Sequence, residues 1–194
     1  MIRDIAMAAS GLLSQKMFGP PVMPYQPEGV WGNFVNQGDA DHWTLSPGED
    51  RYRRGLYTFV RRSARYPSLA VFDAPTREFC TARRTKSDTP LQALATLNDP
   101  AYFEAAQAMA RRIMKEGGAD ASSRAVYGFR LATSRKPKPS EKDALLSGYE
   151  KSLKYYESNP KEAEQVAGQA DAQLASWTML SNSLLNLDES ISKK

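Results

Sequence analysis

The sequence contains one cysteine and one histidine, and this scarcity excludes several kinds of site. A single cysteine cannot form a disulfide within the chain, so it says nothing about an oxidising or reducing compartment. One histidine and one cysteine cannot furnish a structural zinc site, and no Cys-x-x-Cys-His motif is present for covalent haem attachment. We therefore predict no metal site and no cofactor in this segment.

Several motifs and segments are also missing. The chain has no Gly-rich phosphate loop and no G-x-S-x-G motif, so nucleotide binding and serine hydrolysis lack sequence support. No apolar run approaches the roughly 18 residues of a spanning helix, and the chain does not open with a signal-peptide pattern. We predict no membrane span, and the sequence identifies no reaction.

The length, hydrophobic content and charge distribution of the chain indicate its general organisation. The 194 residues are 41% hydrophobic, which is enough for one core, so we expect a single domain over 1–194. The net charge of +4 is distributed unevenly. Residues 51–86 carry ten basic and two acidic side chains, a local net of +8, while the remaining sixteen basic and twenty acidic side chains net −4. The excess of positive charge therefore belongs to the centre of the chain.

The two ends of the chain favour a mainly α fold, a helical bundle-like domain with a long proline-rich N-terminal arm. Apolar residues recur at helical spacing over 1–13, and the pattern starts without a capping segment, which suggests a fragment of a larger protein. Residues 99–194 form a helical unit with a predicted stop at Gly117-Gly118. Its helices are expected to share a core made of Val126, Phe129, Leu131, Leu145, Leu146, Leu174, Trp177, Leu180, Leu184 and Leu185.

Residues 14–50 read as an extended arm and loop. Prolines at positions 20, 21, 24 and 27 fix φ, remove backbone donors and push the preceding residues toward extended conformations. We expect the arm to pack onto the body of the domain, with a peptide-like partner motif as the alternative. The side chains expected to pack are Val22, Met23, Tyr25, Val30 and Trp31.

The Arg-rich central segment, 51–98, is harder to assign. Its first part, DRYRRGLYTFVRR, permits a strand or a short helix, and we favour a helix. Asp73 followed by Pro75 predicts a capped helix over DAPTREFCTARR, and the same device recurs at Thr89-Pro90 and Asp99-Pro100. On that helix Cys80 would stand among arginines, which can activate a thiolate, but no catalytic partner is evident. We favour a half-buried, packing role for Cys80.

The central segment also holds the candidate site. Its arginines could bind phosphates, sulfates or uronates, or could form an internal ion-pair network, which we favour over a ligand. Nucleic acid is a third, less favoured partner for the mixed basic and aromatic side chains. The candidate residues are Asp50, Arg51, Arg53, Arg54, Asp73, Arg77, Glu78, Arg83 and Arg84.

Five stretches together resemble one family: IRDIAMAASGLL, GPPVMPYQPEGVW, GEDRYRRGLYTF, FDAPTREFCTARRTKSDTPLQALATLNDP and SLLNLDE. They are similar to the planctomycete-type PSD-one C-terminal domain of unknown function (domain of unknown function 1553). In full-length members this domain follows a cytochrome-c-like domain and a second uncharacterised domain. The resemblance implies a bacterial exported or envelope protein, often encoded beside sulfatase-like proteins, and it implies no established reaction. Haem would belong only to an upstream domain.

These observations lead to one preferred function and two alternatives. We expect an accessory or interaction domain of a multidomain envelope protein, whose partners are the other domains of that protein. One alternative is an enzyme or binding module for anionic polysaccharide, with Asp50, Asp73 or Glu78 as acid or base. The other alternative is nucleic-acid binding through the Arg-rich segment.

Overall fold

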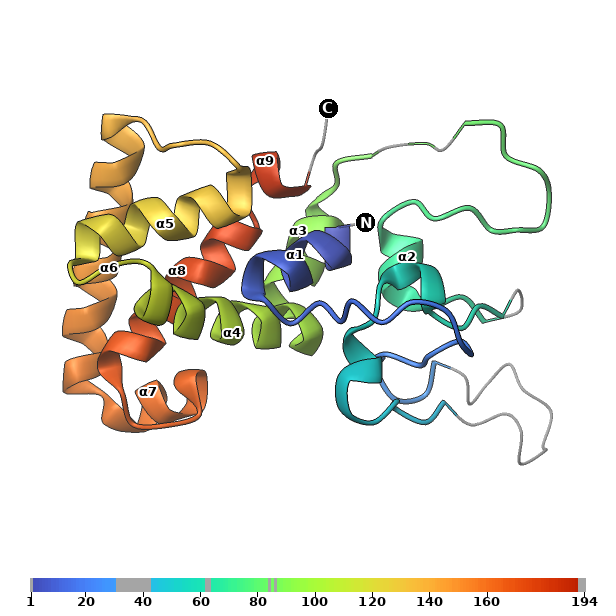
Figure 1. Ribbon diagram of the computed structural model, residues 1–194, viewed down its shortest axis with the longest axis horizontal. Helices are drawn as coiled ribbons and strands as arrows, with labels where there is room; N and C mark the ends of the chain where they lie inside the picture. Colours follow the sequence, from blue (N-terminus) through green and yellow to red (C-terminus); the bar gives the residue numbers. More distant parts are fainter. Residues whose placement is uncertain (1, 31–42, 62–63, 84, 86, 192–194) are drawn as a thin grey trace. The chain divides into compact units, whose positions relative to one another are not determined.

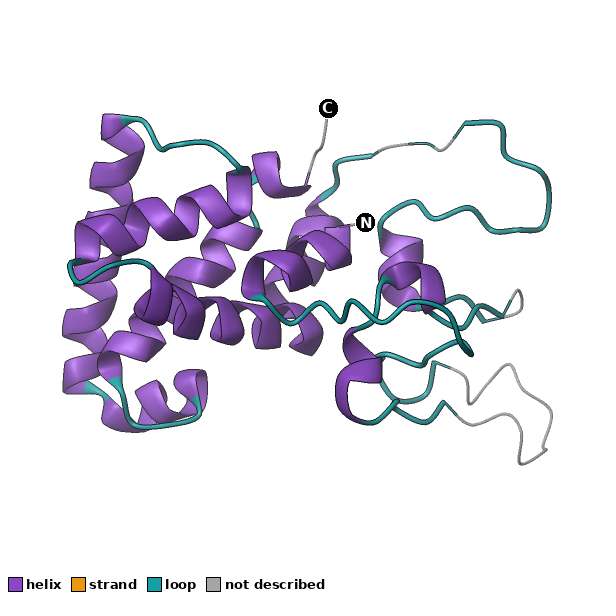
Figure 2. Ribbon diagram, viewed as in Figure 1, coloured by secondary structure: helices purple, strands orange, loops and turns teal. Residues whose placement is uncertain are grey.

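The computed structural model describes residues 2–30, 43–61, 64–83, 85 and 87–191. The chain divides into two compact units: unit 1 comprises Met1–Leu12 and Thr96–Lys194, and unit 2 comprises Leu13–Ala95. Helices make up most of the regular structure, and the described residues contain no strand (Figures 1 and 2). The prediction of a mainly α fold is therefore confirmed, whereas the single-domain assignment stays a prediction.

Unit 1 is a group of packed helices in which α8 is central. α8 contacts α4, α5, α6, α7 and α9, and α1 lies on α4 (Figure 1). The predicted helices of the C-terminal part are confirmed, and α9 is an addition to them. The helix bounds are α1 Ile2–Ser10, α4 Pro100–Glu116, α5 Ala121–Thr133, α6 Pro139–Ser158, α7 Pro160–Ala167, α8 Ala172–Leu185 and α9 Asp188–Ile191.

Small residues allow α4, α5 and α8 to approach one another closely. Ala105 and Ala106 on α4 and Ala175 on α8 have no exposed surface, and small side chains at a helix contact let the backbones approach closely. Gly128 on α5 serves the same purpose, since a Cβ built there would lie 2.7 Å from Cδ1 of Ile113. The helices therefore depend on small side chains at their contacts as much as on large apolar ones.

The predicted core residues of unit 1 fall into two groups. Phe129, Leu174, Trp177, Leu184 and Leu185 are buried. The half-buried members of the set are Val126, Leu131, Leu145, Leu146 and Leu180. Trp177 is the largest fully buried side chain, and its ring stacks on that of Tyr149 with centroids 4.4 Å apart. Aromatic burial on α8 thus joins α8 to α6.

Helix ends in unit 1 follow the sequence signals. Asp99 precedes Pro100 and its carboxylate accepts a hydrogen bond from the backbone N–H of Ala101 at 2.8 Å, as a cap should. Burial raises the pKa of Asp99, against the lowering effect of this hydrogen bond and of the nearby Arg3 charge. At the other end of α4, Gly118 has φ +96°, a left-handed conformation that glycine adopts without strain. The predicted start and stop of α4 are both confirmed.

A charged cluster joins the end of α5 to α6 and α9. The guanidinium of Arg135 makes two hydrogen bonds to Glu141, at 2.7 and 2.8 Å, and two to Glu189 at the same distances. Glu141 also accepts a hydrogen bond from the N–H of Lys138 at the start of α6. These contacts, led by the one with Arg135, lower the pKa of Glu141 from 4.5 to about 2. The Arg135 hydrogen bonds also lower the pKa of Glu189.

Unit 2 has little regular structure among its described residues. It contains two 3-10 turns, η2 Gly48–Tyr52 and η3 Gly55–Tyr57, and the short helix α2 Pro67–Val71. Helix α3, Pro90–Asn98, begins in unit 2 and crosses its boundary at Ala95. Its start confirms the Thr89-Pro90 signal. The helix favoured for DRYRRGLYTFVRR is wrong over its described residues: only the two 3-10 turns form, and they are separated by Arg53 and Arg54, whose ψ angles are 158° and 142°.

Trp177→Ala should strongly destabilise unit 1. Truncating a fully buried tryptophan leaves a cavity and removes its stack on Tyr149, and we expect a loss of about 3–5 kcal/mol. Urea denaturation followed by circular dichroism measures it. Lys154→Ala, on the exposed surface of α6, is the control and should change stability by no more than about 0.5 kcal/mol. Equal effects of the two substitutions would contradict this core assignment.

Glu141→Gln should change how stability depends on pH. A carboxyl whose pKa falls on folding stabilises the folded state above its unfolded pKa, and the contribution disappears as pH drops toward the folded value. Glu141→Gln should therefore melt below the wild type at neutral pH, and the difference should shrink between pH 4.5 and about 2. Melting temperatures across this range test the prediction, with Glu150→Gln on the exposed face of α6 as the control. A difference that is constant with pH would count against it.

Candidate functional site

The proline-rich arm forms a strap across the turns of unit 2. Val22 makes an isolated parallel bridge with Thr58: its N–H donates to the carbonyl of Tyr57 and its carbonyl accepts from the N–H of Phe59, both at 2.8 Å. Ser14 extends the attachment, because its N–H donates to the carbonyl of Tyr52 at 3.2 Å. We call residues 14–24 the strap.

Arg53 holds the strap through hydrogen bonds to two of its backbone carbonyls. It follows η2, and its side chain is only 1% exposed. Its Nη1 donates to the carbonyl of Pro20 at 3.1 Å, and its Nη2 donates to the carbonyl of Phe18. The guanidinium carbon lies 3.8 Å from the ring centroid of Tyr57, a cation–π geometry. One buried cation thus donates to two carbonyls in a segment whose prolines have no backbone N–H with which to form a regular hydrogen-bond ladder.

Aromatic side chains attach the next part of the arm. The hydroxyl of Tyr66 and Nε1 of Trp43 each donate at 2.7 Å, to the carbonyls of Tyr25 and Pro24 respectively. The rings of Trp43 and Tyr66 stack with centroids 5.6 Å apart. Among the side chains expected to pack, Val22 is buried, Met23 and Val30 are half-buried, and Tyr25 is exposed. Trp31 lies outside the described residues.

The remaining candidates near the strap differ in exposure. The carboxylate of Asp50 accepts a hydrogen bond from Lys16 at 2.9 Å, an ion pair between η2 and the strap. Arg51 donates to the hydroxyl of Tyr52, and its guanidinium lies 4.6 Å from the centroid of that ring. Arg54 is exposed. This group of candidates therefore contributes mainly to local structure around the strap.

Asp73 ends helix α2, and the helix predicted to begin at Ala74 does not form. Asp73 has φ +57°, and its N–H donates to the carbonyl of Ala70 at 3.3 Å. The N–H of Ala74 reaches the carbonyl of Leu69 at 2.9 Å, which completes the pair of hydrogen bonds of a Schellman motif. The prediction over DAPTREFCTARR is wrong because Asp73 serves the preceding helix in a left-handed conformation, rather than capping a following one.

The segment after Asp73 is a loop whose base is tied together by Gln92. The carboxylate of Asp73 accepts hydrogen bonds from the N–H and hydroxyl of Ser87, at 2.8 and 2.7 Å. Nε2 of the buried Gln92 donates to the carbonyl of Val71 and to the hydroxyl of Ser87, both at 3.0 Å. Residues on both sides of the loop are therefore held at one point. We call residues 74–83 the arginine loop.

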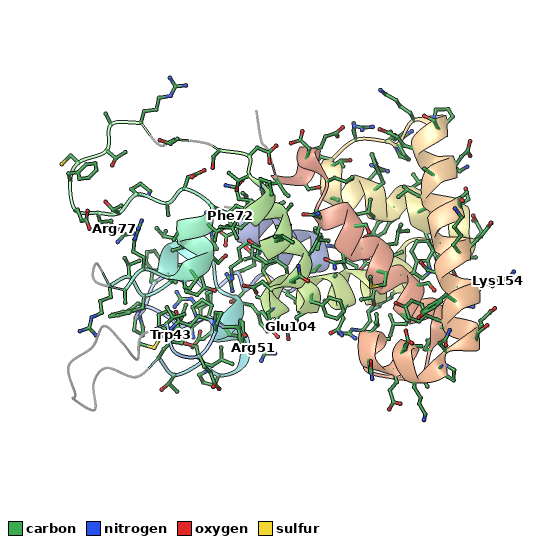
Figure 3. All side chains as sticks on the ribbon, turned by 180° about the vertical axis from the view of Figure 1, so that it is seen from behind. Trp43, Arg51, Phe72, Arg77, Glu104 and Lys154 are labelled. Carbon is green, nitrogen blue, oxygen red and sulfur yellow. The ribbon has the colours of Figure 1, made fainter. Side chains whose placement is uncertain are left out.

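The arginine loop presents its side chains to solvent. Arg77, Glu78, Cys80 and Arg83 are exposed, and Phe79 is 70% exposed. Within the described part of the chain, neither Arg77 nor Arg83 has an ion-pair or hydrogen-bond partner for its guanidinium. Figure 1 shows the chain leaving the end of α2 in an extended loop before α3, and Figure 3 labels Arg77 on this loop. Arg84 lies outside the described residues.

Two expectations for this loop need correction. Cys80 is exposed rather than half-buried, so it does not fill a core. Arg77 and Arg83 point to solvent rather than joining an internal network with the nearby carboxylates. The reason is the same for both: without a helix over 74–83, no apolar face turns these residues toward the body of unit 2.

Gln92 is the residue whose role the sequence analysis missed. Thr89 and Gln92 form a reciprocal capping box at the start of α3, since the N–H of Thr89 donates to Oε1 of Gln92 and the N–H of Gln92 donates to Oγ1 of Thr89. The signal was present as Thr-Pro-Leu-Gln, which matches the capping-box spacing. That spacing does not reveal the second use of Gln92, whose Nε2 points at the base of the loop.

Two kinds of site find no support in the described residues. They contain no group of three or more His, Cys, Asp or Glu side chains that could hold a metal ion. None of the helices described there is both long enough and apolar enough to cross a membrane.

Arg53→Ala should loosen the strap, whereas Arg77→Ala should not. Removing the guanidinium removes two hydrogen bonds from a charged donor to the strap carbonyls, each worth roughly 1.5–3 kcal/mol. We expect faster hydrogen exchange at the amides of Val22 and Phe59, measured by NMR, in Arg53→Ala alone. Protection that persists in Arg53→Ala would show that the strap does not depend on this residue.

Comparison with known proteins identifies the family of the chain. No curated protein and no solved structure matches the chain. One family model, PSD1, protein of unknown function (DUF1553), matches residues 1–149, which include the strap, Arg53, the arginine loop and Gln92. The match covers well over half of the 194 residues. The chain therefore belongs to the PSD1 (DUF1553) family.

Proposed function

We propose that the chain is an accessory interaction domain that binds anionic polysaccharide through the arginine loop. The observation that carries the proposal is the contrast among the arginines of unit 2. Arg53 is buried and bonded to the strap, whereas Arg77 and Arg83 are exposed on a loop whose base is tied together. An exposed guanidinium without an internal partner is available for an external anion.

The chemistry of the loop favours sulfate or carboxylate groups on a sugar chain. Guanidinium groups bind such planar or tetrahedral anions through paired N–H donors. Phe79 offers an exposed aromatic surface between the two arginines, which suits the C–H face of a sugar ring. The fixed base limits the conformational entropy that a loop of this length would lose on binding.

An enzymatic role on the same polymer has less support. Glycoside hydrolysis needs two carboxyl groups on opposite sides of one bond. Asp50 is paired with Lys16, and Asp73 accepts hydrogen bonds from Ser87 at the base of the loop. Both carboxylates thus have structural roles, and the binding function needs neither of them. In this proposal the domain serves a longer bacterial envelope protein, as its family resemblance implies.

The test compares charge removal from the loop with equal charge removal elsewhere. Arg77→Ala/Arg83→Ala should bind heparin or polygalacturonate about tenfold more weakly than the wild type at low salt, because two charge-assisted contacts are lost. Lys151→Ala/Lys154→Ala removes the same charge from the exposed surface of α6 and should retain wild-type affinity. Isothermal titration calorimetry measures all three proteins.

Three outcomes would reject the proposal. The first is no measurable binding of either polysaccharide by the wild type. The second is an equal loss of affinity in both double variants, which would indicate attraction by net charge alone. The third is tighter binding of single-stranded DNA than of either polysaccharide, since nucleic-acid binding relies on a broader basic and aromatic surface.

A further inference from the structure

Phe18 is an exposed phenylalanine held in an unfavourable backbone conformation. Its side chain is 81% exposed, and its φ is +62°. A bulky residue in this left-handed region is strained, and such strain persists only where the surroundings impose it. Gly19 follows with φ +92°, so the strap turns sharply at a corner formed by Met17, Phe18 and Gly19. We call these three residues the Phe18 corner.

Side chains of two other residues hold both backbone polar groups of Phe18. Its N–H donates to the hydroxyl of Tyr57 at 2.9 Å, and its carbonyl accepts from Nη2 of the buried Arg53. The hydroxyl of Tyr57 also lies 3.8 Å from the sulfur of Met17, which is itself half exposed. The guanidinium of Arg53 stacks on the Tyr57 ring, so the two supports brace each other. The position of the Phe18 ring is therefore set by a rigid framework.

Stability of the folded chain does not account for this arrangement. An exposed phenylalanine contributes little hydrophobic stabilisation, and glycine or asparagine would adopt the same φ with less strain. Leu56, which directly precedes Tyr57 in η3, is also 74% exposed. Exposed large apolar side chains thus lie on the corner and in the turn that supports it. A single exposed apolar residue is ordinary, so the signal is the strained backbone of Phe18, held by hydrogen bonds at both polar groups, with a second exposed apolar side chain on its support.

We infer that the Phe18 corner is a docking surface for a protein partner, with Phe18 as the anchor that enters an apolar pocket rimmed by acidic side chains. The acidic rim follows from charge. Among the side chains of residues 14–20 and 48–58 that are not buried, three are basic (Lys16, Arg51 and Arg54) and two are acidic (Glu49 and Asp50), a net of +1, and Arg54 is exposed in the same segment as Leu56. A partner with matching negative charge would associate faster and more specifically.

The rigid support favours a protein pocket over a lipid surface. A bilayer accepts an inserted ring in many orientations, so it requires no fixed backbone. A pocket gains affinity when its anchor is already in the bound geometry, because less conformational entropy is lost on binding. The inference does not rest on the proposed polysaccharide binding, since the corner and the arginine loop share no residue.

The experiment selects ligands from a random peptide library displayed on phage, with the immobilised wild-type chain as the target. Peptides that combine aromatic or aliphatic residues with Asp or Glu should be enriched. Their synthetic counterparts should bind Phe18→Ala about tenfold or more weakly, as expected for a central anchor. Leu91→Ala is the control, because it removes another exposed large apolar side chain of unit 2 that belongs neither to the Phe18 corner nor to the arginine loop, and it should leave peptide affinity unchanged.

A second variant separates docking from folding. Phe18→Gly relieves the left-handed strain and should melt at a higher temperature than Phe18→Ala, while losing peptide affinity to the same extent. Selected peptides that bind the wild type and both Phe18 variants equally would overturn the inference. So would failure to enrich any peptide of the stated composition. Phe18-dependent binding to vesicles of anionic phospholipid, without Phe18-dependent peptide binding, would replace the protein partner with a membrane.

Discussion

The buried guanidinium of Arg53 is the constraint on which unit 2 depends. This unit has no sheet and little helix among its described residues, so side chains must satisfy much of its backbone. Arg53 serves the carbonyls of Phe18 and Pro20 and stacks on Tyr57, which in turn holds the N–H of Phe18. A single cation therefore fixes the strap, the turn at Gly19 and the exposed ring beside it.

Unit 1 is stabilised by different means. Its helices satisfy their own backbone groups, so side chains are free to form a packed core around Trp177 and the buried alanines of α4 and α8. The PSD1 match ends at residue 149, within α6, whereas Trp177 lies beyond it on α8. The core of unit 1 thus includes a large contribution from outside the matched range.

The arginines of the central segment have two separate roles, which the residue type alone does not distinguish. Arg53 is buried because it follows a turn that directs it beneath the strap, and carbonyl acceptors replace the water it loses. Arg77 and Arg83 lie on a loop that has no apolar face, so nothing compensates for burying them. The arginines of the loop are therefore left exposed, whereas the arginine that follows the turn supports the architecture of unit 2.

The sequence predicts where the candidate arginines lie in the chain, but it does not show which of them are buried and which are exposed. Charge distribution placed the arginines in one segment, and the resemblance named the family that the match later showed. Neither the charge distribution nor the resemblance could distinguish the buried Arg53 from the exposed Arg77 and Arg83. Burial depends on which backbone carbonyls lie near each guanidinium after folding. Gln92 illustrates the same limit: its capping-box spacing is local, but its bond to Val71 spans the whole loop.

The sequence by itself determined the helices of unit 1 other than α9, because apolar periodicity, the Asp99-Pro100 start and glycine stops act over a few residues. It could not determine residues 73–83, where Asp73 and Pro75 suit a helix start as well as a helix end. Only the tertiary structure decided between them: the carboxylate of Asp73 bonds to Ser87 and its backbone closes α2, so long-range hydrogen bonds outweighed the local preference for a helix.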